Sequence, residues 1–397
     1  MTTPPPLSNA DLPPTRPAVI LQVLPALKTG GVERTAVDIA VATQQAGCRS
    51  VVVSSGGPMV HEMERSGARH IVLPLDSKNP ITIWRNVARL ADIIRREGVD
   101  IVHARSRAPA WSALWAARRT GRPFLTTFAG IYNFKTRLKR AYNAVMQKGD
   151  LVIANSQFTA DHVHHTYQTP LNKIRVIPRG VDLALFDPAR MRPDRLVAQA
   201  QALRLEDGMP VLMLPGRVTR WKGHRVVVEA IARLDRRDIQ CLFIGSDEGR
   251  EDYRAEIEAL IEQRGLGGII RFAGQVKDMA AAYMLADVVI SASTDPEAFG
   301  RVVAEAQAMG RPVIASDHGG ARETVLPGES GWLVTPSDPN ALAIALTEAL
   351  ALPTAVRTAM GARGQAHIRE NFSKVRMCAD TMQVYTELLE RFTAPQG

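Results

Sequence analysis

Residues 286–316 read ADVVISASTDPEAFGRVVAEAQAMGRPVIAS, and this stretch decides the fold. It begins with a short apolar run, rich in valine and isoleucine, that ends in Ser, Thr, Asp and Pro, a pattern typical of a buried strand. From Arg301 the apolar residues take helical spacing up to Gly310, and a second apolar run follows at 312–316. The order strand, turn, helix, strand is the repeating unit of a parallel α/β sheet.

Two carboxylates, Glu297 and Glu305, stand eight positions apart within this stretch. A continuous helix would separate them by about 80° of rotation and about 12 Å of rise, so they would not lie side by side. We therefore expect Glu297 in the turn beyond the first strand and Glu305 inside the helix, with Gly300 allowing a ligand to approach the helix start. Unpaired amides there attract anions and hydroxyl oxygens. Spacing alone favours the simpler interpretation, in which both glutamates are solvated.

The same alternation of apolar runs and amphipathic stretches extends along the whole chain. It predicts an α/β protein with two doubly wound, Rossmann-like domains that face each other across a cleft. Ligands of such sheets bind beyond the carboxyl ends of the strands, so the cleft is the expected site. The predicted strands lie at 19–24, 50–55, 70–75, 100–104, 124–128, 151–155 and 174–178 in the first half, and at 211–216, 241–246, 269–274, 288–293, 312–316 and 331–335 in the second.

The domain limits follow from composition. A polar, proline-bearing stretch at 182–195 separates the two sets of strands, so we place the first domain at 18–186 and the second at 187–373. Residues 1–17 contain six prolines and little to bury, which predicts a disordered leader. The apolar stretch at 18–27 lacks a small-residue cleavage pattern, so we expect it to form the first strand rather than a signal peptide.

Cysteine and histidine usage indicates the compartment and argues against a metal site. The three cysteines lack paired or metal-ligand spacing, which is typical of a reducing cytosol. No apolar run reaches the roughly 18 residues that a membrane helix needs. We therefore predict a cytoplasmic protein. His162, His164 and His165 could bind a cation, but a solvated helix face is favoured, and no metal site is predicted.

The chain carries a net charge of +9, and residues 101–150 hold ten lysines and arginines against one acid, Asp150. Such a concentration suggests a nucleic acid, an anionic membrane surface or a phosphorylated substrate as partner. Aromatic residues make up only 5% of the chain, and it has no zinc finger, KH loop or RRM core, which argues against nucleic acid. An ordinary solvated surface explains any single charge in the run equally well.

Two turns after predicted strands could contact a phosphate. Gly30 and Gly31 open a helix after the first strand and permit close approach of a ligand to the backbone. Arg217 and Lys222 follow the first strand of the second half, where a guanidinium and an ammonium suit a diphosphate. Neither turn is a Walker loop or a G-x-G-x-x-G fingerprint. Each is a weak signal alone.

Eight motifs follow one another along nearly the whole chain: GGVER (30–34), DIVHA (100–104), NSQFTADHV (155–163), VIPRGVD (176–182), GRVTRWKG (216–223), RFAGQV (271–276), PEAFGRVVAEA (296–306) and GGARE (319–323). In this order they resemble the retaining glycosyltransferases of family 4, glycosyl transferases group 1, which have the GT-B fold. The ending at 374–397 is similar to the family's last helix, which returns to complete the N-terminal domain.

The resemblance implies a role for each strand-exit motif. Glu305 corresponds to the glutamate that accepts hydrogen bonds from the donor's ribose diol, and Glu297 to the one that contacts the donor sugar. Arg217 and Lys222 would hold the diphosphate and offset its charge as it departs, so these two and Glu297 form the implied catalytic set. Val276 is placed like the residue whose backbone pairs with the base. The other implied donor-binding residues are Gly30 and Gly31, which would meet the diphosphate from the opposite domain, and Phe299, Gly300, Arg301 and Val302.

The reaction implied by the resemblance is glycosyl transfer with retention, from a UDP-sugar or GDP-sugar donor. In this family a leaving phosphate oxygen is thought to take the acceptor's proton on the same face of the sugar, so no enzymic nucleophile is required. The chain contains no D-x-D sequence, the usual metal-diphosphate bridge of the other large glycosyltransferase fold. The resemblance therefore implies no metal and no cofactor besides the donor substrate.

Two positions depart from the family pattern. Where Thr-x-His-Gly is usual, this chain has TTFAG, so Ala129 replaces an imidazole that commonly contacts the donor sugar and phosphate. Arg179 stands where asparagine is frequent and adds a cation near the cleft. Both departures bear on donor choice and on activity, not on the fold.

Acceptor identity should come from the N-terminal domain, with His103, Arg105 and Ala129 on the acceptor side. The basic stretches with aromatics at 105–119 and 133–148 suit anionic lipid headgroups. Trp111 and Trp115 are expected to pack in the core. We predict a glycosyltransferase that docks on the inner face of the cell membrane and extends a glycan or a lipid-linked acceptor, as in lipopolysaccharide or envelope polysaccharide synthesis. A nucleotide-sugar epimerase of the same fold and an inactive sugar-nucleotide-binding homologue are the alternatives.

Overall fold

A computed structural model describes residues 16–28, 30–132, 134, 136–234 and 236–393. Most of the predicted leader, residues 1–15, lies outside this range. The described chain forms two compact units: residues up to Arg179 together with those from Val375 onward, and Gly180–Lys374. The division after Arg179 falls a few residues before the predicted limit at 186.

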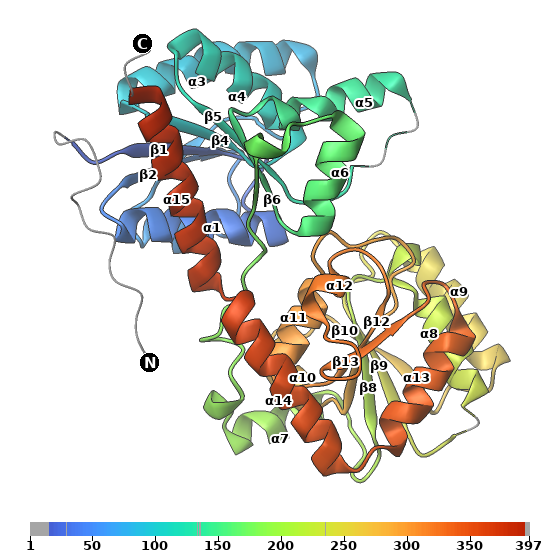
Figure 1. Cartoon of the computed structure of the whole chain (residues 1–397). Helices are drawn as coiled ribbons and strands as arrows, with labels where there is room; N and C mark the ends of the chain where they lie inside the picture. The colour runs from blue at the N-terminus through green and yellow to red at the C-terminus, as the bar shows by residue number, and fades with distance from the viewer. Residues whose placement is uncertain (1–15, 29, 133, 135, 235, 394–397) are drawn as a thin grey trace. The chain divides into compact units, whose positions relative to one another are not determined.

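The first unit contains a sheet of seven strands (Figure 1). Its strands are β1 (Val19–Val23), β2 (Arg49–Ser54), β3 (Arg69–Val72), β4 (Ile101–Ala104), β5 (Phe124–Phe128), β6 (Leu151–Ala154) and β7 (Ile174–Val176). Its helices are α1 (Gly31–Gln45), α2 (Val60–Glu64), α3 (Pro80–Glu97), α4 (Arg107–Thr120), α5 (Arg137–Asn143), α6 (Gln157–Tyr167) and nearly all of α15 (Lys374–Thr393), with 3₁₀ turns η2 (Ala144–Lys148) and η3 (Leu171–Lys173).

The second unit contains a sheet of six strands. Its strands are β8 (Val211–Pro215), β9 (Gln240–Ile244), β10 (Ile270–Gly274), β11 (Val288–Ser291), β12 (Val313–Ser316) and β13 (Gly331–Val334). Its helices are α7 (Pro193–Ala202), α8 (His224–Arg233), α9 (Glu251–Gln263), α10 (Met279–Leu285), α11 (Arg301–Ala308), α12 (Ala321–Thr324), α13 (Pro339–Ala351) and α14 (Thr354–Asn371), with 3₁₀ turns η4 (Pro188–Arg190) and η5 (Arg220–Lys222).

Both sheets are parallel and doubly wound. The strand order is β3-β2-β1-β4-β5-β6-β7 in the first and β10-β9-β8-β11-β12-β13 in the second. In each sheet the order reverses beside the first strand of the unit, between β1 and β4 and between β8 and β11. In open α/β sheets, ligands bind beyond the carboxyl ends of the strands at such a reversal. The prediction of two doubly wound α/β domains is confirmed.

Helices cover both faces of each sheet, which explains why the central strands are mostly apolar rather than alternating. In the first sheet Leu21 packs with α3 and α4 on one face, whereas Ile20 packs with α15 on the other. In the second sheet Leu212 packs with α8, α9 and α13, and Met213 packs with α10 and α11 on the opposite face. Successive residues of a strand point to opposite faces, so each strand contributes to two cores.

Local signals set the ends of α3. The side chain of Asn79 accepts a hydrogen bond from the amide of Ile81 at 2.9 Å, and Pro80 occupies the first helical position. Gly98, which ends the helix, has φ +63°. Glycine is favoured at such a left-handed position because a residue with a Cβ would be strained there.

The last helix, α15, packs on the first unit. The Tyr385 hydroxyl lies 2.8 Å from Nδ1 of His103, and Arg175 donates a 2.9 Å hydrogen bond to Glu387. Met382 and Leu388 lie in the same apolar cluster as Ile20. Residues at the two ends of the described chain therefore share one core.

The two tryptophans of α4 differ in burial. Trp111 packs against the main core of the first unit and donates a 3.2 Å hydrogen bond to the carbonyl of Tyr142. Trp115 is 50% exposed. Core packing is therefore confirmed for Trp111 and wrong for Trp115, because helical spacing shows that two residues share a face but not how far that face is covered.

Among the described residues no single helix is long and apolar enough to cross a bilayer, and α13 with α14 meets that test only as a pair bent by 114°.

Candidate active site

The candidate donor site lies at the carboxyl edge of the second sheet. The loops after β8 and β11 come from adjacent strands, and the loop after β12 follows the next strand in the sheet. The β8 loop carries Lys222, the β11 loop carries Glu297, and the β12 loop carries Gly319 and Gly320. Parallel strands end at the same edge, so residues distant in sequence meet here.

Lys222 and Glu297 form an ion pair at the centre of this edge. The Lys222 ammonium lies 2.7 Å from Oε1 of Glu297, and the Ser293 hydroxyl donates to the same oxygen at 2.5 Å. The side chains of Lys222 and Glu297 are only 12% and 17% exposed. Burial by itself would raise the pKa of Glu297, but the charge of Lys222, the hydrogen bonds from Lys222 and Ser293, and the charge of His318 outweigh it, so the pKa lies below its ordinary value.

The chain around Lys222 is held close to the β11 loop. Gly223 has φ +77°, and a Cβ there would lie 1.8 Å from the carbonyl oxygen of Ala292. The amide of Thr294 donates a 2.8 Å hydrogen bond to the carbonyl of Trp221. The ammonium of Lys222 also lies 4.5 Å from the centre of the Trp221 ring. These contacts bring the KG of the GRVTRWKG motif against the loop that carries Glu297.

The glycine pair at 319–320 supports the Glu297 loop from the other side. The amide of Gly320 donates a 2.8 Å hydrogen bond to the carbonyl of Glu297. Gly319 has φ +61°, and a Cβ there would lie 2.2 Å from that carbonyl oxygen; one on Gly320 would lie 2.5 Å from the Cα of Phe299. No side chain fits at either position. The GGARE motif therefore positions the acidic loop.

Glu297 and Glu305 occupy the predicted settings. Glu297 lies in the loop after β11, and Glu305 lies in α11 and is 8% exposed. Glu305 accepts hydrogen bonds from Arg301 at 2.6 Å and from the Tyr283 hydroxyl at 3.2 Å. Burial, together with the charge and hydrogen bond of Glu305, raises the pKa of Tyr283 well above its ordinary value. Tyr283 therefore stays a hydrogen-bond donor to Glu305.

The remaining residues implied for donor binding lie around this edge with different exposure. Phe299 is 3% exposed and its ring lies 5.7 Å from that of Phe372, so only its backbone is available to a ligand. Gly300 has φ +83° and precedes α11. Arg217 is exposed on the β8 loop. Val302 on α11 and Val276 after β10 are partly buried against the core.

Sequence reasoning did not single out Ser293, His318 or Tyr283. Ser293 stands at a strand exit, which is a usable signal in a parallel sheet, but serine is common at such turns. Tyr283 on α10 carries no signal, because its contact with Glu305 depends on how two helices pack on one sheet face.

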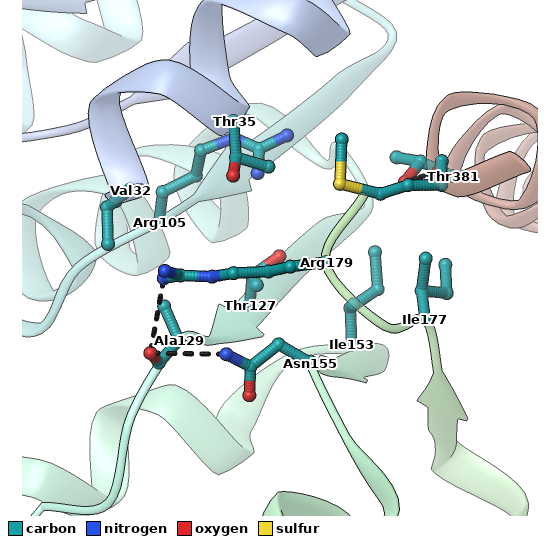
Figure 2. A pocket seen from close by; sticks show the side chains of 11 residues that line it. Val32, Thr35, Arg105, Thr127, Ala129, Ile153, Asn155, Ile177, Arg179 and Thr381 are labelled. Carbon is teal, nitrogen blue, oxygen red and sulfur yellow. Dashed lines mark hydrogen bonds between the residues drawn. The ribbon is translucent and has the colours of Figure 1, made fainter. Parts of the chain in front are cut away.

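The first unit contains a separate cavity at the carboxyl ends of its own strands (Figure 2). Its volume is about 30 Å³, and it is lined by Val32, Thr35, Arg105, Thr127, Ala129, Ile153, Asn155, Ile177, Arg179, Met377 and Thr381. Most of these walls are apolar, and two arginines stand among them. None of the lining residues is acidic.

The two departures from the family pattern meet in this cavity. Nη2 of Arg179 donates a 3.3 Å hydrogen bond to the carbonyl of Ala129, and Nδ2 of Asn155 donates to the same oxygen at 3.3 Å. Figure 2 shows the Arg179 side chain extended across the cavity with its guanidinium beside Ala129. The arginine therefore lies beside the methyl group that stands where the family usually has an imidazole.

His103 lies in β4 and Arg105 directly follows this strand, but the two side chains differ in setting. Arg105 lines the cavity, is 3% exposed, and donates from Nε to the Gln22 side chain. His103 is fully buried, and its ring nitrogens lie 2.8 Å from the Tyr385 hydroxyl and 2.7 Å from that of Thr127. Burial, and next the charge of Arg105, hold the pKa of His103 well below its ordinary value. The structure thus gives His103 an internal position between β5 and α15, not one on the cavity surface.

The glycines at the start of α1 are not required by backbone conformation. Gly30 has φ 179°, an extended value that any residue adopts. A Cβ on Gly30 would lie 2.2 Å from a carboxylate oxygen of Glu33, the end of a flexible side chain. Gly31 is the first residue of α1, and Val32 and Thr35 of that helix line the cavity.

Within the described ranges, no group of three or more His, Cys, Asp or Glu side chains is arranged to hold a metal ion. Nδ1 of His164 lies 2.9 Å from the carbonyl of Thr169, and the ring of His165 packs beside that of His164.

Comparison with known proteins decides the family. Residues 29–185 match the model described as Glycosyltransferase Family 4, and residues 198–367 match Glycosyl transferases group 1. A glycosyltransferase from Rickettsia africae, solved by crystallography, is 37% identical, with a TM-score of 0.88 over 95% of this chain and 100% of that one. The chain belongs to glycosyltransferase family 4. Its two doubly wound units are those of the GT-B fold.

Two further relatives of this family 4 chain are informative. The D-inositol 3-phosphate glycosyltransferase of Paenarthrobacter aurescens is 32% identical over 251 residues, which are 62% of this chain and 59% of that protein. The chain thus spans about three fifths of the length of this relative. HepE of Anabaena, solved with UDP and glucose, has a TM-score of 0.82 at 23% identity and covers 93% of this chain and 100% of that one. At that identity the likeness establishes the fold alone.

Proposed function

We propose that this chain transfers a sugar from a nucleotide-diphosphate sugar to an acceptor hydroxyl with retention of the anomeric configuration. The observation that carries the proposal is the buried Lys222–Glu297–Ser293 cluster at the carboxyl edge of the second sheet. An ion pair so little exposed is costly to maintain for stability alone, because removing two charges from water cancels much of their attraction. A cation and a carboxylate that both face a ligand-binding edge indicate recognition of a polar, anionic substrate.

The donor would bind with its parts matched to these residues. Arg217 and Lys222 would hold the diphosphate, and Lys222 would then share its charge between phosphate and Glu297. Glu297, kept ionised by its neighbours, would accept hydrogen bonds from the sugar hydroxyls. Glu305, oriented by Arg301 and Tyr283, would accept from the ribose diol. The crystallised complex of HepE with UDP and glucose supports a uridine donor as the first one to test.

The proposed reaction requires no enzymic nucleophile. The acceptor oxygen attacks the anomeric carbon on the face from which the diphosphate departs, and the bond between that carbon and the phosphate oxygen breaks. The departing phosphate oxygen takes the acceptor's proton. Arg217 and Lys222 offset the negative charge that grows on the diphosphate, the kind of electrostatic stabilisation that usually contributes most. We expect no metal and no cofactor to be required.

We further propose that the enzyme acts on the inner face of the cell membrane in the synthesis of an envelope glycan such as lipopolysaccharide. A surface of α3 and α4 supports this. Trp84 is 75% exposed and Trp115 is 50% exposed, and they share a shallow hollow with Val87, Arg118 and Arg119. Aromatic rings flanked by arginines suit the headgroup region of an anionic bilayer.

Direct assay of the full chain tests the transferase proposal. Thermal-shift screening with UDP- and GDP-sugars should select a donor, because ligand binding to the folded state raises the midpoint. Incubation with that donor and candidate acceptors should give a product with the donor's anomeric configuration, which is measured by NMR. The reaction should also proceed in the presence of a chelator. Conversion of the donor sugar without any acceptor would identify an epimerase instead. Donor binding without turnover on any acceptor would favour an inactive homologue.

Vesicle sedimentation tests the membrane proposal separately. The wild-type chain should bind vesicles containing phosphatidylglycerol at low salt and release them as salt rises. Replacing Trp84 and Trp115 together by alanine should weaken that binding, whereas Ile344→Ala, at an apolar side chain of α13 that is 62% exposed, should not. Wild-type protein that ignores anionic vesicles at low salt would refute the membrane proposal and favour a soluble acceptor.

A further inference from the structure

The cavity of the first unit contains a buried cation with an unused hydrogen-bond donor. Arg105 is 3% exposed, and no described residue hydrogen-bonds its Nη2. Burial lowers the pKa of Arg105, and the Tyr385 hydroxyl is the main group that opposes this shift. An unpaired donor on a buried charged group costs more than the same group paired, so such atoms call for a partner. A ligand oxyanion would supply one.

A second guanidinium lines the same cavity. Arg179 extends over Ala129 from the end of β7, while Arg105 enters from the end of β4 beside Thr35 (Figure 2). None of the eleven lining residues is a carboxylate. Most of the remaining wall surface is apolar, from residues such as Ile153, Ile177 and Met377, and a low-dielectric wall strengthens the attraction of both cations for an anion.

From these observations we infer that the cavity of the first unit is a subsite for a phosphate monoester carried by the acceptor, held between Arg105 and Arg179. Two guanidinium groups together balance a phosphate monoester, which has a charge of −1.5 to −2 near neutral pH. A carboxylate, with a charge of −1, would leave part of their positive charge unbalanced. Guanidinium forks also match phosphate oxygens in geometry. The hydroxyl of Thr35 and the amide of Asn155, both in the cavity wall, are further polar groups within this subsite.

The small residue at 129 is part of this arrangement. A larger side chain at that position would extend toward the guanidinium that bonds the Ala129 carbonyl. The alanine therefore leaves room for Arg179 to reach across the cavity. Assigning the phosphate to the acceptor rests on the proposed transferase function, but anion binding by the two arginines does not.

The test uses inorganic phosphate as the probe, titrated into the full chain by isothermal calorimetry. Two arms remove the donor site of the second unit: saturation with UDP, and the Lys222→Ala variant. Phosphate should bind in both arms. Arg179→Gln and Arg105→Gln should each weaken phosphate binding at least about tenfold, whereas Arg65→Gln, which removes the same charge from an exposed position after α2, should leave it unchanged. Acetate should bind at least about tenfold more weakly than phosphate, since it has half the charge.

The arms separate the two proposals. If neither UDP nor GDP binds, the proposed function fails, and the Lys222→Ala arm still reports on the cavity. If the Arg105 variant does not fold, the half-buried Arg179 provides the second measurement. Phosphate binding that UDP or Lys222→Ala abolishes, that ignores both arginine variants, or that acetate matches would overturn the subsite.

The source of the monoester is resolved with two more probes. Binding of glycerol 3-phosphate in solution, lost in Arg179→Gln, would assign the subsite to a soluble phosphorylated acceptor. Binding that depends on Arg179 and occurs only with vesicles containing phosphatidic acid would assign it to a lipid headgroup. Either outcome supports the phosphate subsite.

Discussion

Replacing Lys222 by alanine is the most direct perturbation of the proposed donor site. The ammonium lies 2.7 Å from Glu297, and both side chains are more than four-fifths buried, so solvent screens the pair only weakly. Loss of one charge-assisted hydrogen bond costs about 1.5–3 kcal/mol. If Lys222 contacts the diphosphate with comparable strength in the transition state, kcat/KM should fall by about 10- to 150-fold, at about 1.4 kcal/mol per factor of ten.

The variant should also change the pH dependence of the rate. Without Lys222, burial of Glu297 is no longer offset by its main neighbouring charge, so the pKa of this carboxyl should rise. The acid limb of the kcat/KM profile should therefore move to higher pH. Steady-state kinetics from pH 4 to 8 with the donor chosen by thermal shift measures both effects.

Arg220→Ala is the matched control. Arg220 lies two residues away in the same 3₁₀ turn, η5, but is 71% exposed and pairs with Glu256 instead. The Arg220→Ala substitution removes one positive charge from the same loop and leaves the buried Lys222–Glu297 pair in place. If Lys222→Ala and Arg220→Ala have the same kcat/KM and the same acid limb, the assignment of the donor site is refuted. A double-mutant cycle with Glu297→Gln should further show strong non-additivity, because the two groups are in contact.

Three further predictions follow from single contacts. Gly319→Ala should reduce both the free energy of unfolding and turnover, because a Cβ there would lie 2.2 Å from the carbonyl oxygen of Glu297. The control Gly328→Ala, at a similar φ of +76° but with open space around the Cβ, should lose only about 1–2 kcal/mol of stability and no activity. Urea unfolding and steady-state kinetics compare the two variants. The folded-state pKa of Glu297 is lowered, so its ionisation stabilises the fold above its ordinary pKa of 4.5, and this contribution disappears as the pH falls. The difference in free energy of unfolding between wild type and Glu297→Gln should therefore narrow from pH 7 to pH 3.5. A difference that stays constant over this range would contradict the lowered pKa. Ala129→His should lower turnover, because the added ring would overpack the space that Arg179 occupies, and overpacking typically costs about 1–3 kcal/mol. A clear gain of activity in this variant would show instead that the natural chain lacks an imidazole its site needs.

Much of the architecture could be predicted from local pattern. The apolar runs marked all thirteen strands of the described residues, because a strand covered by helices on both faces is mostly apolar along its length. The strand-turn-helix pattern around Glu297 and Glu305 also placed each carboxylate in its correct setting, since eight positions cannot bring two side chains together on one helix. The roles of these residues in binding a donor remain predictions.

Other features could not be predicted from periodicity. Trp115 has the same helical spacing as a core residue but is half exposed, because none of the described elements covers that part of α4. His103 follows the pattern of a strand-end residue, yet Tyr385 from the opposite end of the chain takes one of its ring nitrogens. Both outcomes depend on which elements pack against a face, and a single segment does not encode this.

The sequence by itself determined that this chain forms two parallel, doubly wound sheets with charged and glycine-rich turns at the strand exits, because strand, helix and turn preferences act within a few residues. Only the tertiary structure decided which of those turns meet. Lys222 and Glu297 are 75 residues apart, and Arg179 and Ala129 are 50 apart. These contacts exist because parallel strands end at the same edge of a sheet. The distance between their side chains is therefore set by the order of the strands in the sheet and not by their order in the chain.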